Sequence, residues 1–306
     1  MHLDPRSNER AMNVLDPGEL SSRRYYQSKA VDLAPRMLAG ELGVVAGSRE
    51  LSGFGSGPDC VFFALGLIGL GVLSLVYGDF ALQWQPVPAW VPARTYLAYA
   101  SGAVMIAGGA GLLWRRTASL SSDVLLVYLL LWLLLLKLPH VVTAPLLEFN
   151  WLGFGEIAVI VAAGWVLFAA DRGQTESSTL KFATGESGMR IARFIFGLAL
   201  IPIGLSHFVY APQTIGFVPA WLPFRPAWAY ITGAGHIAAG LGVLFGVFRR
   251  LAAMLEAAMI GVFTALVWVP LVVKTPTSQL QWTGFLISWT IAAAAWVVAG
   301  SMASRR

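Results

Sequence analysis

Apolar runs of about 20 residues recur along this chain, and no other feature constrains its fold so strongly. A helix needs about that length to cross the 30 Å hydrocarbon core of a bilayer. The run VLLVYLLLWLLLLKLPHVV is apolar around the whole helix, which is typical of a helix in lipid. We predict eight spans, near residues 60–78, 95–114, 121–142, 151–170, 191–210, 227–248, 251–273 and 282–300. The predicted fold class is therefore an all-α integral membrane protein.

The composition agrees with this prediction. Hydrophobic residues make up 57% of the chain and charged residues only 12%, whereas soluble domains carry roughly 25% charged residues. The single cysteine, Cys60, excludes an intramolecular disulfide, a thiolate metal cluster and a dithiol relay. The N-terminus has no short apolar segment after a basic start, so we expect no cleavable signal peptide.

Residues 1–58 differ from the rest of the chain in carrying mixed charges and few large apolar residues. They end in the linker-like stretch LSGFGSGP, and this composition is typical of disorder. We predict a mostly disordered cytoplasmic tail. Met12 and Met37 are alternative starts of translation, which leaves the true length of the tail open.

The basic residues predict the orientation. The tail, the loops after spans two, four and six, and the C-terminus together hold 17 of the 21 Lys and Arg residues. The positive-inside rule then places both termini in the cytoplasm, as expected for a multi-pass protein of a bacterial-type inner membrane. The pI near 9.6 thus reflects topology, and we expect the bilayer, not nucleic acid, as the partner.

An internal repeat appears when the sequence is aligned with itself. Residues 87–113 align with residues 218–244 without a gap, and 15 of the 27 positions are identical. We call this constant offset the repeat register. It also pairs Pro139 with Pro270, Pro145 with Pro276, Trp151 with Trp282, Gly153 with Gly284 and Trp165 with Trp296.

The repeat predicts the organisation of the chain. The expected segments are a tail at 1–58, a first four-helix unit at 59–170, a cytoplasmic linker at 171–190 and a second four-helix unit at 191–306. Four spans per unit is an even number, so both units enter the membrane the same way round. They are therefore expected to form a parallel repeat.

Two motifs occur in both units. One is the loop VPAWVPAR or VPAWLPFR, and the other is the glycine-rich second span YASGAVMIAGGAGLL or YITGAGHIAAGLGVL. In these motifs the chain resembles the DoxX-like family of small four-helix membrane proteins, here as two tandem copies covering nearly the whole membrane part. The resemblance implies a membrane redox system, since the family includes a subunit of a thiosulfate–quinone oxidoreductase. Members often carry a glutamate in the second span, where this chain has Met105 and His236.

Ionisable residues inside a membrane are costly and are therefore candidates for function. We expect His236 near the middle of its span, and Glu156, His207 and His140 toward the outer ends of theirs. Together these four could form a proton-handling or quinone-headgroup site, because imidazole and carboxylate both exchange hydrogen bonds. Local hydrogen bonds between helices are the alternative interpretation. Tyr230, Thr232 and Ser206 are the expected partners of His236, and Glu256 is expected to pair with Arg249 and Arg250 at the inner interface.

Haem ligation is not favoured, because His207 and His236 are expected to differ in depth by roughly two turns. No ligand pair recurs at helical spacing, so we expect no metal site. The remaining cofactor prediction is a quinone. The outer loops form a second candidate site, in which two tryptophans and two arginines meet a ligand or seal the bundle: Trp90, Arg94, Trp221 and Arg225.

The expected function is that of a membrane subunit or accessory of a quinone-linked redox system, with a soluble or membrane redox partner. Two alternatives from other classes remain open. A carrier for a small, largely apolar solute would need a broken helix or a polar cavity between the two units. A scaffold without catalysis would tolerate free substitution of His236 and Glu156.

Overall fold

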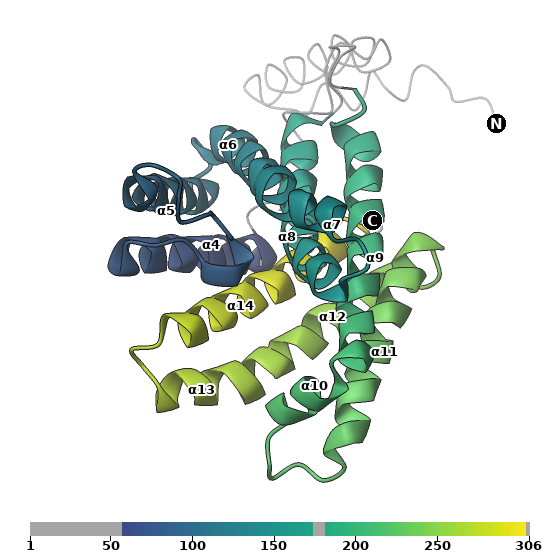
Figure 1. Ribbon diagram of the computed structural model, residues 1–306. Helices are drawn as coiled ribbons and strands as arrows, with labels where there is room; N and C mark the ends of the chain where they lie inside the picture. The colour runs from purple at the N-terminus through teal and green to yellow at the C-terminus, as the bar shows by residue number, and fades with distance from the viewer. Residues whose placement is uncertain (1–56, 174–180, 304–306) are drawn as a thin grey trace, which may run out of the picture. The chain divides into compact units, whose positions relative to one another are not determined.

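The computed structural model describes residues 57–173 and 181–303, and the regular structure within these ranges is helical (Figure 1). All but the last two residues of the predicted tail lie outside these ranges. The helices of the first half are α4 (Pro58–Tyr77), η1 (Leu82–Trp84), α5 (Arg94–Leu112), α6 (Ala118–Leu131), η2 (Trp132–Lys137), α7 (Leu138–Thr143) and α8 (Glu148–Arg172). Those of the second half are α9 (Gly185–Val209), α10 (Ala211–Phe217), α11 (Arg225–Leu244), α12 (Arg249–Phe263), η3 (Thr264–Trp268), α13 (Val269–Lys274) and α14 (Gln279–Gly300).

Seven helices in the described part of the chain are long and apolar enough to cross a membrane. Two of the seven are composite, because α6–η2–α7 and α12–η3–α13 each run on as one segment of 26 residues. The prediction of an all-helical chain with membrane-length apolar helices is confirmed, and these helices are compatible with a polytopic membrane protein. The predicted second span, now α5, is not among the seven. Its glycines and its two tyrosines, Tyr96 and Tyr99, lower the hydropathy of this 19-residue helix.

A π-helical stretch interrupts each composite span at the same place relative to a proline. Pro139 follows η2 and Pro270 follows η3. Proline lacks an N–H, and its ring clashes with the carbonyl four residues earlier. That carbonyl lies inside the π-helical stretch in both spans, so the wider turn relieves the clash while the helix continues.

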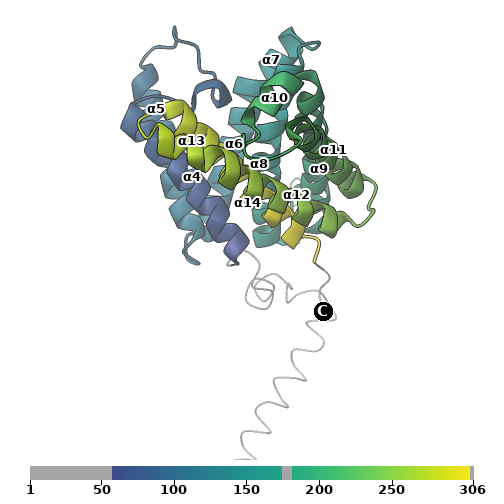
Figure 2. The ribbon, with the colours of Figure 1, turned by 90° about the horizontal axis from the view of Figure 1, so that it is seen from below.

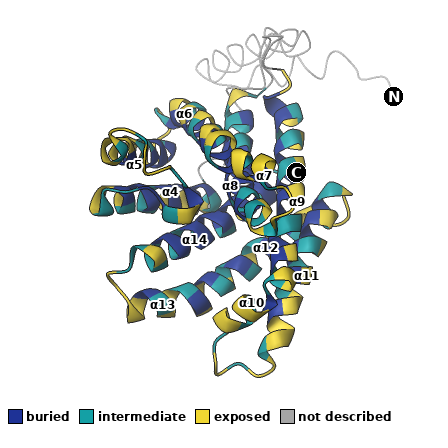
Figure 3. Cartoon of the chain, in the orientation of Figure 1, coloured by how far each residue is buried: buried dark blue, intermediate teal, exposed yellow. Residues whose placement is uncertain are grey.

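Helices α8 and α14 form the centre of the described helices. Buried residues make up 78% of the apolar window of α8 and 67% of that of α14, a larger share than in any other of the seven spans. Helix α14 packs against α4 and α8, and α8 packs against α9 (Figure 2). One hydrophobic core therefore joins both halves of the chain, with residues from α4 through α14. Figure 3 shows buried residues along α4 and α14, where these helices face each other.

Several local features recur in the repeat register. Helices α5 and α11, α6 and α12, α7 and α13, and α8 and α14 each begin at equivalent positions of the two units. The side chain of Arg94 donates to the carbonyl of Val87, and Arg225 donates to that of Val218. The residues before these arginines, Ala93 and Phe224, both have a positive φ. The indoles of α8 and α14 repeat the pattern: Trp151 donates to the Pro145 carbonyl, and Trp282 to that of Pro276.

Glycines bring the first two helices of each half into close contact. A Cβ at Gly102 in α5 would lie 2.8 Å from the carbonyl oxygen of Gly71 in α4, which is closer than a side chain can approach. A Cβ at Gly233 in α11 would meet the Cβ of His207 in α9 at 2.6 Å. Small residues permit this backbone approach, and it sets the register of neighbouring membrane helices.

Candidate functional site

A buried histidine–glutamate pair joins α11 to α12. Nδ1 of His236 lies 2.6 Å from Oε1 of Glu256, and the two residues are 6% and 1% exposed. The helices form an antiparallel hairpin in which His236 is eight residues before Leu244 and Glu256 is seven residues after Arg249. These distances from the turn differ by one residue, so the two side chains lie at nearly the same level, about 10–12 Å along the helices. A carboxylate that accepts from imidazole fixes the tautomer and orientation of the ring.

A second imidazole meets this pair from α9. The ring centroids of His207 and His236 are 5.1 Å apart, with the rings edge to face at 60°. Nδ1 of His207 is within hydrogen-bonding distance of the Ala229 carbonyl at 3.1 Å and of the Thr232 hydroxyl at 3.0 Å. Two hydrogen-bonded pairs, His236 with Glu256 and His207 with Thr232, thus meet through the contact of the two imidazole rings. We call these four residues the histidine cluster.

One oxygen in the histidine cluster is unsatisfied. Oε2 of Glu256 is buried and has no hydrogen-bond partner among the described residues. A buried acceptor without a partner costs about 1–3 kcal/mol, so such an atom calls for an explanation by a ligand, a water or a proton. The cluster therefore offers one free acceptor beside two groups that can each donate or accept a proton.

The sequence-based expectations for His236 were wrong in two respects. Its partner is Glu256, whereas Thr232 bonds to His207 and the Ser206 hydroxyl donates to the Ile203 carbonyl. Glu256 accordingly does not pair with Arg249 or Arg250. The separation by two turns was also wrong, because the approach of α9 to Gly233 places His207 only three residues from the level of His236. Side chains lean toward the N-terminus of their helix, so those of antiparallel α9 and α11 lean toward each other.

Glu156 lies in a different polar cluster, in the first half. Its Oε2 accepts from the indole of Trp84 at 2.9 Å, and the Trp84 carbonyl accepts from Trp132 at 2.6 Å. Lys137, which is only 7% exposed, donates to the Gln83 carbonyl at 2.8 Å and attracts the Glu156 carboxylate. We call Trp84, Lys137 and Glu156 the lysine cluster.

Two further groups extend the polar region of the first half. Both carboxylate oxygens of Glu148, two turns before Glu156 on α8, are buried without a hydrogen-bond partner among the described residues. The Tyr128 hydroxyl lies 2.7 Å both from the Gln85 amide, which donates to it, and from the Ser101 hydroxyl. Lys137 was not among the predicted site residues, although a lysine within a leucine-rich run is a direct signal for a buried charge.

The remaining candidates lie at the surface. His140 is exposed, and its carbonyl accepts from the Asn150 side chain. Trp90 and Trp221 are 81% and 70% exposed. Arg94 pairs with Asp79 at 2.5 Å, and Arg225 donates to the Ile215 carbonyl at 2.7 Å, so neighbouring groups of the chain already bind both guanidinium groups. Of the four membrane candidates, the structure brings together only His207 and His236.

Comparison with known proteins places the histidine cluster in a recognised segment. Residues 196–299 match a family described as a domain of unknown function (DUF8561). The matched segment contains all four residues of the histidine cluster and none of the lysine cluster. No curated protein and no solved structure matches the chain. Within residues 57–173 and 181–303, no three His, Cys, Asp or Glu residues are grouped as a metal site requires.

Proposed function

We propose that this chain is a membrane subunit or accessory of a quinone-linked redox system, and that the histidine cluster binds the quinone headgroup. The observation that carries the proposal is the buried His236–Glu256 pair with its free carboxylate oxygen. An imidazole N–H can donate to a quinone carbonyl, and a carboxylate oxygen can accept from a hydroquinone hydroxyl. The resemblance to the DoxX-like family supports a quinone as the ligand.

The proposed architecture is eight spans, arranged as two parallel copies of one four-helix unit. The features that recur in the repeat register support it, including the paired helix starts and the matching arginine and tryptophan hydrogen bonds. Helix α5 is then the eighth span, because its counterpart α11 is itself of membrane length and apolar. The packing also supports an axis between the units. Helix α9 is the counterpart of α4, and α8 is the counterpart of α14. Helix α4 packs on α14, and α9 packs in the same way on α8.

Comparison of the two units gives matched variants for testing the quinone proposal. The first unit has Met105 and Leu125 where the second has His236 and Glu256. We expect wild-type protein extracted from its native membrane to co-purify with quinone. The paired variant His236→Met with Glu256→Leu should lose it, because the polar groups become apolar while the packing follows that of the sister unit. Quinone is measured by solvent extraction and chromatography of the purified protein.

The control for the quinone experiment is His140→Met, which removes an exposed imidazole outside the cluster. Equal quinone content in wild type and the paired variant would contradict the proposal and favour a scaffold. Uptake of a small apolar solute into vesicles by wild type, with no quinone in either protein, would favour a carrier.

The proposed orientation, with both termini in the cytoplasm of a bacterial-type inner membrane, is tested by labelling. Most basic residues lie on the side of the chain that we assign to the cytoplasm, so Ser187 should be inside and Gln213 outside. Single cysteines at these positions, in a Cys60→Ala background, are treated in intact cells with a membrane-impermeant thiol reagent. We expect labelling of Gln213→Cys only. Labelling of Ser187→Cys without cell lysis would reverse the topology.

A further inference from the structure

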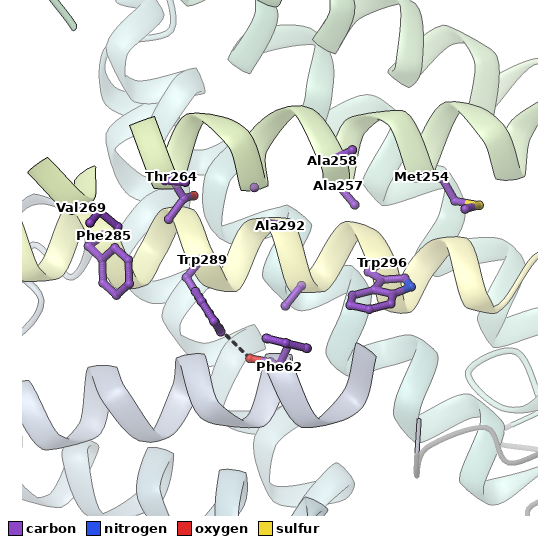
Figure 4. A pocket seen from close by; sticks show the side chains of 13 residues that line it. Phe62, Met254, Ala257, Ala258, Thr264, Val269, Phe285, Trp289, Ala292 and Trp296 are labelled. Atoms are coloured by element: carbon purple, nitrogen blue, oxygen red, sulfur yellow. Dashed lines mark hydrogen bonds between the residues drawn. The ribbon is translucent and has the colours of Figure 1, made fainter. Parts of the chain in front are cut away.

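An elongated apolar groove lies between α12–η3, α14 and the beginning of α4 (Figure 4). Its volume is about 520 Å³. Four aromatic side chains form one wall: Phe62 from α4, and Phe285, Trp289 and Trp296 from α14. Small residues on α12 and η3 form the other wall, and a Cβ added at Gly261 would meet nothing within 4 Å.

The groove is not a requirement of the four-helix unit. Ala257, Gly261 and Ala265 line it, and their counterparts in the repeat register are Leu126, Leu130 and Leu134. Each replacement of leucine by alanine or glycine removes three or four carbon atoms from the surface of the helix. The second unit is therefore hollow at the place where the first unit has leucines.

The lining excludes a charged or strongly polar occupant. Among the described residues, no charged side chain lines the groove, and its Thr264 hydroxyl and Trp289 indole are already bonded. The Thr264 hydroxyl donates to the Ile260 carbonyl at 2.8 Å and lies 2.6 Å from the Ser288 hydroxyl. The Trp289 indole donates to the Phe62 carbonyl at 2.9 Å. An occupant that complements this surface is hydrocarbon.

The dimensions of the groove match a single chain. A volume of 520 Å³ is that of a site for one small ligand, whereas a docking helix is about 10–12 Å across with its side chains. The lining runs along α12–η3–α13 from Met254 to Val269, which is about 22 Å at 1.5 Å per residue. One leaflet is about 15 Å deep, half of the hydrocarbon core, so the groove is longer than one leaflet and can hold an acyl chain over its full length.

We propose that this groove binds one acyl chain of a membrane phospholipid, held as a lipid specifically bound to the second unit. This proposal requires that the helices lie in a bilayer. It does not depend on the binding of a quinone at His236. Hydrocarbon of the surrounding leaflet enters the groove from the side, and the aromatic wall packs along the chain. The lipid headgroup stays outside the groove, since no charged side chain among the described residues lines it.

Filling the groove tests this proposal. Gly261→Leu combined with Ala265→Leu gives the second unit the leucines of the first, and Val262→Leu is the matched control because Val262 is 57% exposed and does not line the groove. Native mass spectrometry of detergent-purified protein counts the retained phospholipids. We expect about one per chain in wild type and control, and about tenfold less retention in the filled variant.

A second measurement uses wild type alone, so the test stands even if the filled variant fails to fold. A phospholipid with a photoreactive group in its acyl chain should cross-link to peptides from residues 254–269 or 285–296. Equal retention in wild type and filled variant, or adducts spread over all spans, would overturn the proposal. Loss of quinone from the filled variant with phospholipid unchanged would also overturn it, while leaving quinone binding by the chain intact.

Discussion

Changing His236 to methionine alone is expected to destabilise the protein by about 3–5 kcal/mol, because it leaves the Glu256 carboxylate buried without a partner. Glu256 is 1% exposed, and its second oxygen already has no hydrogen-bond partner among the described residues. Glu256→Leu should cost less, since a neutral imidazole is less costly to bury than a carboxylate. The free energy of unfolding is measured by titrating detergent-purified protein with a denaturing detergent.

The paired variant His236→Met with Glu256→Leu decides whether this loss comes from the broken pair. It reproduces Met105 and Leu125 of the first unit, which are both buried and almost inaccessible. Replacing both partners by apolar residues of similar volume is often neutral or stabilising, so we expect most of the stability to return. If the two single losses simply add in the paired variant, His236 and Glu256 are not coupled and the histidine cluster is not a unit.

Replacing Lys137 by methionine is expected to cost about 2–3 kcal/mol, because it removes the donor to the Gln83 carbonyl and the positive charge that attracts the Glu156 carboxylate. Lys137 is 7% exposed, so water cannot easily substitute for its ammonium group. Adding Glu156→Gln should recover at least half of this loss. The amide oxygen can still accept from the Trp84 indole, and no charge remains to be compensated.

Leu135→Met is the control for the lysine cluster, since this neighbouring side chain is 64% exposed and has no polar partner to lose. It should leave the free energy of unfolding within about 0.5 kcal/mol of wild type. A Lys137→Met variant as stable as this control would show that the ammonium group contributes nothing to the fold. A further loss on adding Glu156→Gln would contradict the role assigned to the charge.

The helices themselves were predictable from local sequence. A backbone in lipid must satisfy its own hydrogen bonds, so a run of about 20 apolar residues is sufficient reason for a helix. The predicted spans overlap α4, α5, α8, α9, α11 and α14 and the two composite segments, with starts displaced by up to six residues. The largest displacement is at α9, where Gly185, Glu186 and Arg190 extend the helix beyond its apolar part. Charged residues continue a helix as readily as apolar ones, so hydropathy alone marks only the membrane part.

The position of α5 shows the limit of composition. Its register with α11 predicts a span, yet its glycines and tyrosines reduce its hydropathy below that of the other seven helices. These same glycines bring α5 against α4, where Gly102 lies over the Gly71 carbonyl. Residues selected for close helix packing are poor in apolar surface, so a signal based on hydropathy weakens where packing is tightest.

The sequence by itself determined that this chain is helical and apolar in membrane-length segments, and that residues 87–113 resemble residues 218–244 without a gap. Only the tertiary structure decided which polar residues meet. His236 pairs with Glu256 because a hairpin sets them at one level, and it reaches His207 because a glycine contact sets the register of α9 on α11. Glu156 accepts instead from the Trp84 indole. Hydropathy is a property of each segment, whereas these contacts depend on the rotation and register of helices far apart in the chain.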